Sequence, residues 1–254
     1  TAAYPIYASA FYALSVLPED FHEWEYLANS RTPEAYNKIV KGNADIIFVA
    51  QPSGGQKKRA EESGVTLIYT PFAREAFVFI VNADNPVNSL TEQQVRDIFS
   101  GAITNWRTVG GNDQEIQTWQ RPEDSGSQTV MQSQVMKNVR MISPQETEVA
   151  SMMEGMIKVV AEYRNTNNAI GYTFRYYATQ MNDDKNIKLL AINGIAPTAE
   201  NIRNGKYPYI VDAFMVTREN TTSETQKLLE WFLTPQGQSL VEDVGYVPMY
   251  KTLP

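Results

Sequence analysis

Residues 116–136 read IQTWQRPEDSGSQTVMQSQVM, and the fold expected for this chain follows from this stretch. Its first part, 116–120, alternates apolar and polar residues, which predicts a strand, and its last part, 129–136, predicts a helix. Between them lie small hydroxyl and glycine residues at 125–127. The N–H groups in the first turn of a helix make no bond within the helix, and the helix dipole adds positive potential there. The order strand, small-residue loop, helix is therefore typical of an anion-binding site.

The loop carries the groups that a tetrahedral oxyanion needs. Ser125, Ser127 and Thr129 supply hydroxyl donors, and Gly126 lets the backbone approach a ligand closely. Arg121 supplies a forked, permanently charged donor. An ordinary helix N-cap is the alternative, because Ser and Asp cap helices in many proteins. The loop by itself leaves both interpretations open.

Composition restricts the classes of protein that the chain can belong to. At 254 residues, with 43% hydrophobic and 20% charged residues, it is expected to form one large or two smaller globular domains. The net charge of −7 argues against a nucleic-acid-binding surface, so a small anion must be bound by a local site. The chain has no cysteine, which excludes disulfides, thiolate metal sites and cysteine nucleophiles. No apolar run approaches the roughly 18 residues that a membrane span needs.

Catalytic motifs are scarce. The single histidine, His22, lies in the polar stretch 20–24 and is interpreted as a surface or loop residue. One histidine cannot form a histidine-rich metal site, and a Ser-Gly-Ser segment without a histidine partner is a poor nucleophile. The sequence shows neither a Walker-type loop nor a dinucleotide fingerprint. We therefore expect a binding protein rather than an enzyme, without a metal or a cofactor.

The rest of the chain alternates helices and strands, which predicts an α/β fold with largely parallel sheets. The loop 121–129 would lie at the carboxyl ends of the strands, where ligands bind in such sheets. Beyond the stretch quoted above, strands are expected at 44–50, 65–69, 76–81, 169–174, 187–192 and 209–217. Helices are expected at 1–14, 32–40, 56–63, 91–100, 146–163, 224–233 and 235–243.

Several further motifs, taken together with the loop, resemble the phosphate-binding component of bacterial phosphate ABC transporters. They are NPVNSLT at 85–91, SGAITNW at 100–106, VGG at 109–111, AIGY at 169–172, WFLTPQGQ at 231–238 and VGYVP at 244–248. The resemblance covers nearly the whole chain and implies a type II periplasmic-binding-protein fold. In that fold two α/β lobes are joined by two crossing strands, here expected at 76–81 and 209–217. Lobe 1 would consist of residues 1–76 plus 212–254, and lobe 2 of residues 77–211.

The resemblance also implies a function. It is that of an extracytoplasmic solute-binding protein that captures inorganic phosphate between its lobes and delivers it to an ABC transporter permease. The alternatives are a binder of another oxyanion, such as sulfate, and a sensor or adhesion protein that reuses the fold. We expect a monomer in the periplasm or at the outer face of the cell membrane. A lipid anchor upstream of Thr1, as in a lipoprotein, would be its only attachment to the membrane.

Carried over residue by residue, the resemblance assigns phosphate ligands to both lobes. Thr32 is expected to be both the N-cap of its helix, with Pro33 at the first helical position, and a ligand. The other first-lobe ligands are expected at the start of the first helix, and the second-lobe ligands in the loop 121–129. They are Thr1 and Ala2 in the first lobe, and Arg121, Ser125, Gly126 and Ser127 in the second.

One departure from the family pattern concerns ion selectivity. Family members place an aspartate just after the strand that corresponds to 44–49, where it accepts the proton of hydrogen phosphate and repels fully ionised sulfate. That position here falls at Ala50 or Gln51. The Gln51 side-chain oxygen can accept a proton, but it carries no charge that would repel sulfate.

Five charged residues near the expected site have secondary assignments. Arg31, Arg74 and Glu75 are interpreted as surface or hinge residues at the lobe edges that could compensate for the missing aspartate. Glu123 or Asp124 is expected to hold Arg121 in place. Gln51, Arg74 and Asp124 are therefore secondary candidates for the site.

Overall fold

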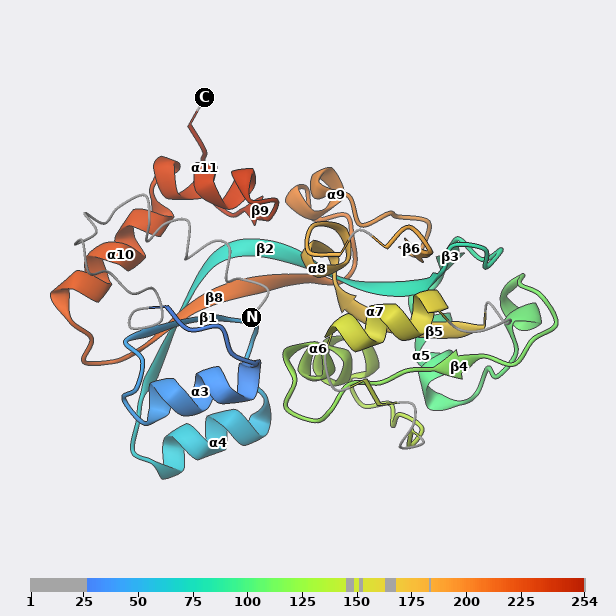
Figure 1. The fold of residues 1–254 in the computed structure, drawn as a ribbon, viewed down its shortest axis with the longest axis horizontal. Helices are drawn as coiled ribbons and strands as arrows, with labels where there is room; N and C mark the ends of the chain where they lie inside the picture. Colours follow the sequence, from blue (N-terminus) through green and yellow to red (C-terminus); the bar gives the residue numbers. More distant parts are fainter. Residues whose placement is uncertain (1–26, 145–148, 151–152, 163–167, 183, 254) are drawn as a thin grey trace. The chain divides into compact units, whose positions relative to one another are not determined.

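The computed structural model describes residues 27–144, 149–150, 153–162, 168–182 and 184–253 (Figure 1). The helix predicted at 1–14 lies outside the described residues, and so do the proposed ligands Thr1 and Ala2 and the histidine at position 22.

Two compact units make up the described chain. Unit 1 contains the described residues up to Arg74 and those from Asp212 onward, together with the short segment Asp124–Gly126. Unit 2 contains the described residues of two segments, Glu75–Glu123 and Ser127–Val211. Two strands, β2 (Leu67–Asn82) and β8 (Ile210–Arg218), run from one unit into the other, because the unit boundaries fall inside them.

Unit 1 is built on a short sheet. Strand β1 (Ile46–Val49) pairs antiparallel with β8, in a register that sets Ile46 opposite Thr217. Strand β9 (Val247–Pro248) pairs antiparallel with β2 at Ala73 and Arg74. The described residues of the unit form the helices α3 (Thr32–Val40), α4 (Gly54–Glu62), α10 (Ser223–Leu233) and α11 (Pro235–Asp243).

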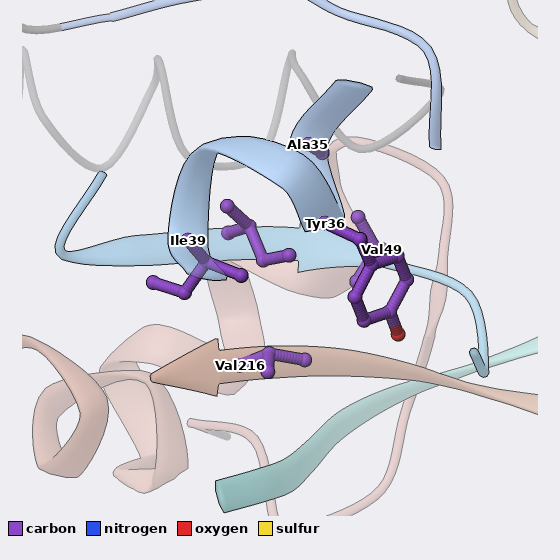
Figure 2. Close-up of a cluster of buried hydrophobic side chains, with 6 residues drawn as sticks. Ala35, Tyr36, Ile39, Val49 and Val216 are labelled. Carbon is purple, nitrogen blue, oxygen red and sulfur yellow. The ribbon is translucent and has the colours of Figure 1, made fainter. Parts of the chain in front are cut away.

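The apolar face of α3 forms one core of unit 1. Figure 2 shows Ala35, Tyr36 and Ile39 of this helix against Val49 of β1 and Val216 of β8. The helical residues follow one another at spacings of one, three and four, so their side chains share a face and can pack on the strands. Ala35 is 4% exposed, and each of the other four residues is 3% exposed or less.

Unit 2 surrounds the other half of β2. Strand β5 (Ala169–Phe174) pairs antiparallel with β2 from Phe77 to Val81 and parallel with β4 (Gln117–Thr118). The remaining strands are β6 (Ile187–Leu189), which also pairs with β2, and the pair β3 (Ser89–Leu90) and β7 (Ala191–Ile192). The described residues form the helices α5 (Glu92–Ser100), α6 (Gly126–Val130), α7 (Met153–Glu162), α8 (Arg175–Thr179) and α9 (Ala199–Arg203), with a 3-10 turn at Trp106–Val109 and a π-helix at Met131–Met136. Gly126, the first residue of α6, belongs to unit 1.

The ends of α5 are those that the sequence predicts. The Thr91 hydroxyl accepts a hydrogen bond from the Gln94 N–H at 3.0 Å, and the Gln94 side chain accepts from the Thr91 N–H at 2.8 Å. This reciprocal pair is a capping box. Gly101 ends the helix at φ 82°, a left-handed conformation that favours glycine. Thr91 and Gly101, which belong to the motifs at 85–91 and 100–106, therefore have a structural explanation that is independent of any ligand.

Two strand predictions are corrected by the structure. The strands expected at 65–69 and 76–81 are one continuous strand, β2, which passes through Pro71. A proline is compatible with a strand where its position needs no backbone donor, so it does not have to end the strand. The expectation of largely parallel sheets is also wrong for the described strands. The pairings of β2 with β5, β6 and β9 and of β1 with β8 are antiparallel, whereas β4–β5 and β3–β7 are parallel.

The helix expected at 146–163 begins later than predicted, at Met153. Val149 forms a parallel bridge with Gln120, and the Ala150 N–H donates to the Gln120 carbonyl at 2.9 Å. Residues 149–150 therefore extend the pairing beyond the end of β4. Apolar spacing alone did not distinguish this short extended piece from the first turn of the helix that follows.

Candidate functional site

Arg121 follows β4 and is fixed by hydrogen bonds within unit 2. Its side chain is 8% exposed, and its guanidinium Nη1 donates to the Ala150 carbonyl at 2.5 Å. Its backbone N–H donates to the Tyr172 hydroxyl at 3.1 Å and to the Gln128 side-chain oxygen at 3.3 Å. The Tyr172 hydroxyl in turn donates to the same Gln128 oxygen. Arg121 is thus a buried cation whose backbone and side chain are both held in place.

The support for Arg121 continues into the core of unit 2. The Tyr172 ring lies 5.4 Å from that of Phe77 and 5.6 Å from that of Phe99, measured between centroids. Burial raises the pKa of Tyr172, so its hydroxyl stays protonated and available as a donor at neutral pH. The tyrosine links the candidate loop to the apolar core through one hydrogen-bonded oxygen.

The expected helix after the loop is present. Helix α6 begins at Gly126, and the π-helix Met131–Met136 continues it. Gly126 and Ser127 are buried, and Ser125, just ahead of the helix, is partly buried. Asp124 has φ 64°, a left-handed conformation that aspartate adopts more readily than most residues. The residues that the sequence proposes as anion donors therefore lie at a helix start, as the strand–loop–helix pattern predicts.

Asp124 does not use its carboxylate as the sequence suggests. The carboxylate accepts a hydrogen bond from the Ser53 hydroxyl and one from Arg59 Nη2 at 3.0 Å. The Ser53 hydrogen bond, followed by Arg59, lowers the pKa of Asp124, so the side chain is anionic at neutral pH. Arg121 is held instead by the Ala150 carbonyl.

Thr32 and Gln51 both lie in unit 1. Thr32 is partly buried and is the first residue of α3, but the N-cap is Arg31, and Pro33 is the second helical residue. The predicted cap is therefore displaced by one residue. The Glu34 carboxylate accepts from the Arg31 backbone N–H at 3.1 Å and thereby replaces a capping hydroxyl. Gln51 is partly buried and follows β1 by two residues, at the position predicted from the sequence.

Glu75 is not the exposed residue that the sequence suggests. It is 4% exposed, its Oε1 accepts from the Ala76 N–H at 2.7 Å, and its Oε2 accepts from the Tyr176 N–H at 2.9 Å. Burial raises the pKa of Glu75 to about 7, although the two N–H groups and Arg175 oppose the shift. Arg31, by contrast, is an exposed partner of Glu34. Strand periodicity missed this burial because Glu75 lies in the middle of the continuous strand β2.

This buried carboxylate predicts a specific pH dependence of stability. The folded protein holds the Glu75 proton up to a pH of about 7, whereas the unfolded chain releases it near the ordinary value of 4.5. The free energy of unfolding should therefore fall as the pH rises from about 4.5 to about 7, and it should level off at higher pH. At 1.36 kcal/mol per pKa unit, the fall that comes from this group is about 3 kcal/mol. Glu75→Gln removes the titration, so its unfolding free energy should fall less between pH 5 and pH 7. Denaturant unfolding at pH 5, 6, 7 and 8 measures the two slopes.

Glu61→Gln provides the control, because Glu61 is an exposed carboxylate on α4. Its variant should keep the wild-type pH slope. A Glu75→Gln protein with the wild-type slope would show that Glu75 does not titrate in this range. A uniform loss of stability in Glu75→Gln is expected in addition, because its amide N–H₂ faces a backbone N–H where the carboxylate accepted a bond.

Three side chains that sequence reasoning missed are Ser53, Gln56 and Arg59, all of which contact Asp124. A local signal for two of them was present, because Ser53 and Gln56 have the Ser-x-x-Gln spacing of a capping box. That spacing predicts the start of α4 but not a partner more than 60 residues away. Within the part of the chain that the structure describes, no group of three or more His, Cys, Asp or Glu residues could hold a metal ion.

Two α/β units that share two strands, with a buried arginine and a small-residue helix start, define the class of two-unit α/β ligand-binding proteins. The model of the PBP superfamily domain matches residues 15–236, and the chain belongs to this superfamily.

Relatives and solved structures agree with the assignment. The chain is 29% identical over 209 residues to the phosphate-binding protein PstS of Bacillus subtilis. This aligned segment covers 82% of the chain and 64% of that relative. The chain thus spans less than two thirds of this relative's length. The crystal structure of a phosphate ABC transporter substrate-binding protein from Clostridium perfringens, with bound phosphate, matches this chain with a TM-score of 0.73 at 22% identity. The match covers 98% of this chain and 96% of the other. The structure of an ABC-type phosphate transport receptor from Vibrio cholerae matches with a TM-score of 0.62 at 24% identity, covering 88% and 85%. Both structures support the fold.

Proposed function

We propose that this protein is an extracytoplasmic solute-binding protein that captures inorganic phosphate and delivers it to an ABC transporter permease. The observation that carries the proposal is the loop 121–127, in which a buried, hydrogen-bonded Arg121 precedes a helix start formed by small residues. The names of the relatives support the choice of phosphate. The proposed ligands are those taken from the sequence: Thr1, Ala2, Thr32, Arg121, Ser125, Gly126 and Ser127.

The chemistry of these groups matches a tetrahedral oxyanion. Arg121 supplies a planar fork of charged N–H donors, and the start of α6 supplies backbone N–H groups and the Ser127 hydroxyl. The protein carries a net charge of −7, so the anion has to be bound by short-range hydrogen bonds rather than drawn in by the overall field. These properties favour binding over catalysis, and we infer that the protein does not transform its ligand.

A second candidate ligand is sulfate, and the residue after β1 favours it. Ala50 and Gln51 stand where the resembling family has its proton-accepting aspartate. The Ala50 carbonyl accepts a hydrogen bond from the Tyr36 hydroxyl at 3.0 Å, so this segment is anchored to α3. Without a carboxylate at this position, charge repulsion does not exclude a fully ionised anion there.

Calorimetric titration with phosphate and with sulfate, each at neutral and at alkaline pH, tests the proposal. Tight phosphate binding together with weak sulfate binding is the expected result, because hydrogen phosphate can donate its proton to the Gln51 oxygen and sulfate cannot. Equal affinities would mean that the protein binds oxyanions without discriminating between them. Binding of neither anion would contradict the proposal.

Localisation and partners follow from the same proposal. The transport role places the protein outside the cytoplasm, in contact with a permease, as a monomer that a lipid anchor attaches to the membrane. Among the described residues, no helix is long and apolar enough to span a bilayer. Phosphate uptake by cells that carry a deletion of the gene, compared with cells that carry it, separates transport from a sensing or adhesion role.

A further inference from the structure

Asp124 makes three hydrogen bonds to the first two turns of α4 and to its N-cap. Its carboxylate accepts from the Ser53 hydroxyl and from Arg59 Nη2, and its backbone carbonyl accepts from Gln56 Nε2 at 3.0 Å. These partners are 71, 65 and 68 residues away in the sequence. One residue of the candidate anion loop is thus bonded through both its side chain and its backbone.

Ser53 and Gln56 also form the capping box at the start of α4, and each of them has one further donor, which bonds to Asp124. The Ser53 hydroxyl accepts from the Gln56 N–H at 3.1 Å, and the Gln56 side-chain oxygen accepts from the Ser53 N–H at 2.9 Å. The Ser53 O–H and the Gln56 N–H₂ group then both donate to Asp124. Gln56 is only 1% exposed, and a buried amide left without a partner destabilises the fold. Ser53 and Gln56 therefore cap α4 and also bind Asp124.

The position of the loop segment follows from these bonds. Asp124–Gly126 is grouped with unit 1, although its chain neighbours Glu123 and Ser127 are grouped with unit 2. Asp124 is also held at φ 64°, where a non-glycine residue is uncommon. Ser125 and Gly126, two of the proposed phosphate ligands, follow it directly. The bonds of Asp124 therefore fix the residue that directly precedes these two ligands.

We propose that Asp124 is a positioning residue for the oxyanion: its bonds to Ser53, Gln56 and Arg59 hold Ser125 and Gly126 in the conformation that binds phosphate. The inference rests on the proposed function and deepens it. Asp124 need not touch the anion, and its negative charge by itself opposes anion binding. A preorganised loop binds more tightly because less conformational freedom is lost when the ligand enters.

Two substitutions at this position test the proposal by calorimetry with inorganic phosphate. Asp124→Gly keeps the left-handed backbone without strain but removes both carboxylate bonds, and phosphate affinity should fall about tenfold. Asp124→Asn keeps an oxygen that accepts from Ser53 and loses only the ion pair with Arg59. Arg59 is 44% exposed, so that pair contributes little, and Asp124→Asn should restore most of the lost affinity. Both variants should keep melting temperatures close to that of the wild type.

Asp113→Gly is the matched control, because Asp113 also pairs with an arginine, Arg107, at 3.2 Å but is 68% exposed and lies outside the loop. Its phosphate affinity should equal that of the wild type. Unchanged or tighter binding by Asp124→Gly would overturn the inference, since tighter binding would mean that the carboxylate acts only as a repelling charge. An equal loss in Asp124→Gly and Asp124→Asn would also overturn it. Wild-type protein that binds neither phosphate nor sulfate would instead overturn the proposed function.

Discussion

Phosphate affinity is expected to fall by a factor on the order of 100 or more when Arg121 is replaced by alanine. A hydrogen bond to a charged group contributes about 1.5–3 kcal/mol, and an arginine fork makes two such bonds to an oxyanion. The loss of both corresponds to at least about 3 kcal/mol, which is more than a hundredfold in the dissociation constant. Calorimetric titration with phosphate measures this change. Arg121→Lys should recover only part of the affinity, because a lysine presents a point charge without the fork.

The fold should survive this substitution. The backbone N–H of Arg121, which donates to Tyr172 and Gln128, is kept in the alanine variant. The bond from the guanidinium to the Ala150 carbonyl is lost, and circular dichroism and thermal unfolding should report a modest loss of stability. Arg107→Ala is the control, because Arg107 is 75% exposed and pairs with Asp113 on the surface. Wild-type phosphate affinity in Arg121→Ala would exclude Arg121 from the site.

The largest effect on stability is expected from Gly237→Ala. Gly237 is in the first turn of α11, and an added Cβ would lie 2.3 Å from the Trp231 carbonyl oxygen and 2.6 Å from the Phe232 Cα. Both are backbone atoms at the end of α10, so no side-chain rotation relieves the clash. We expect a loss of roughly 3 kcal/mol, at the upper end of overpacking effects, because α10 and α11 must separate. Denaturant unfolding of the whole protein measures this loss.

Gly54→Ala is the matched comparison, because Gly54 is also a first-turn helix residue in unit 1 but has no atom within 4 Å of an added Cβ. Alanine there should be neutral or should stabilise the protein by up to about 1 kcal/mol. Equal effects of the two substitutions would mean that α11 can shift away from α10 without loss. The close approach at Gly237 gives a structural reason for this glycine in the motif WFLTPQGQ at 231–238.

Gln238, the next residue of that motif, explains why α11 cannot easily shift. It is completely buried, and its Nε2 donates to the carbonyls of Phe72 at 2.9 Å and Phe232 at 2.8 Å. Its Oε1 accepts from the backbone N–H groups of Met249 at 2.8 Å and Tyr250 at 2.9 Å. One buried amide thus joins α11 to β2, to the end of α10 and to the C-terminal segment. Moving the helix would leave buried polar groups without partners.

Local features of the protein could be predicted from its amino-acid sequence. The capping residue Thr91 and the helix end at Gly101 could be predicted, because caps and turns depend on residues three or four apart. The helix expected at 129–136 was also predicted, although it begins three residues earlier, at Gly126. The α/β class was predicted correctly from the alternation of apolar periods. Arg121 was recognised as a candidate ligand because a charged fork next to a helix start has a chemistry that needs no tertiary information.

Which distant groups meet depends on how the elements pack, and local sequence patterns do not reveal it. Periodicity carries no information on strand direction, so the antiparallel pairings of β1 with β8 and of β2 with β5 could not be foreseen. The burial of Glu75 depends on the Tyr176 N–H, 101 residues away, and the bonds of Asp124 depend on α4. A local pattern shows that such a carboxylate exists but not which donor it will find. That choice is made when packing brings separate elements together and every buried polar group has to be paired.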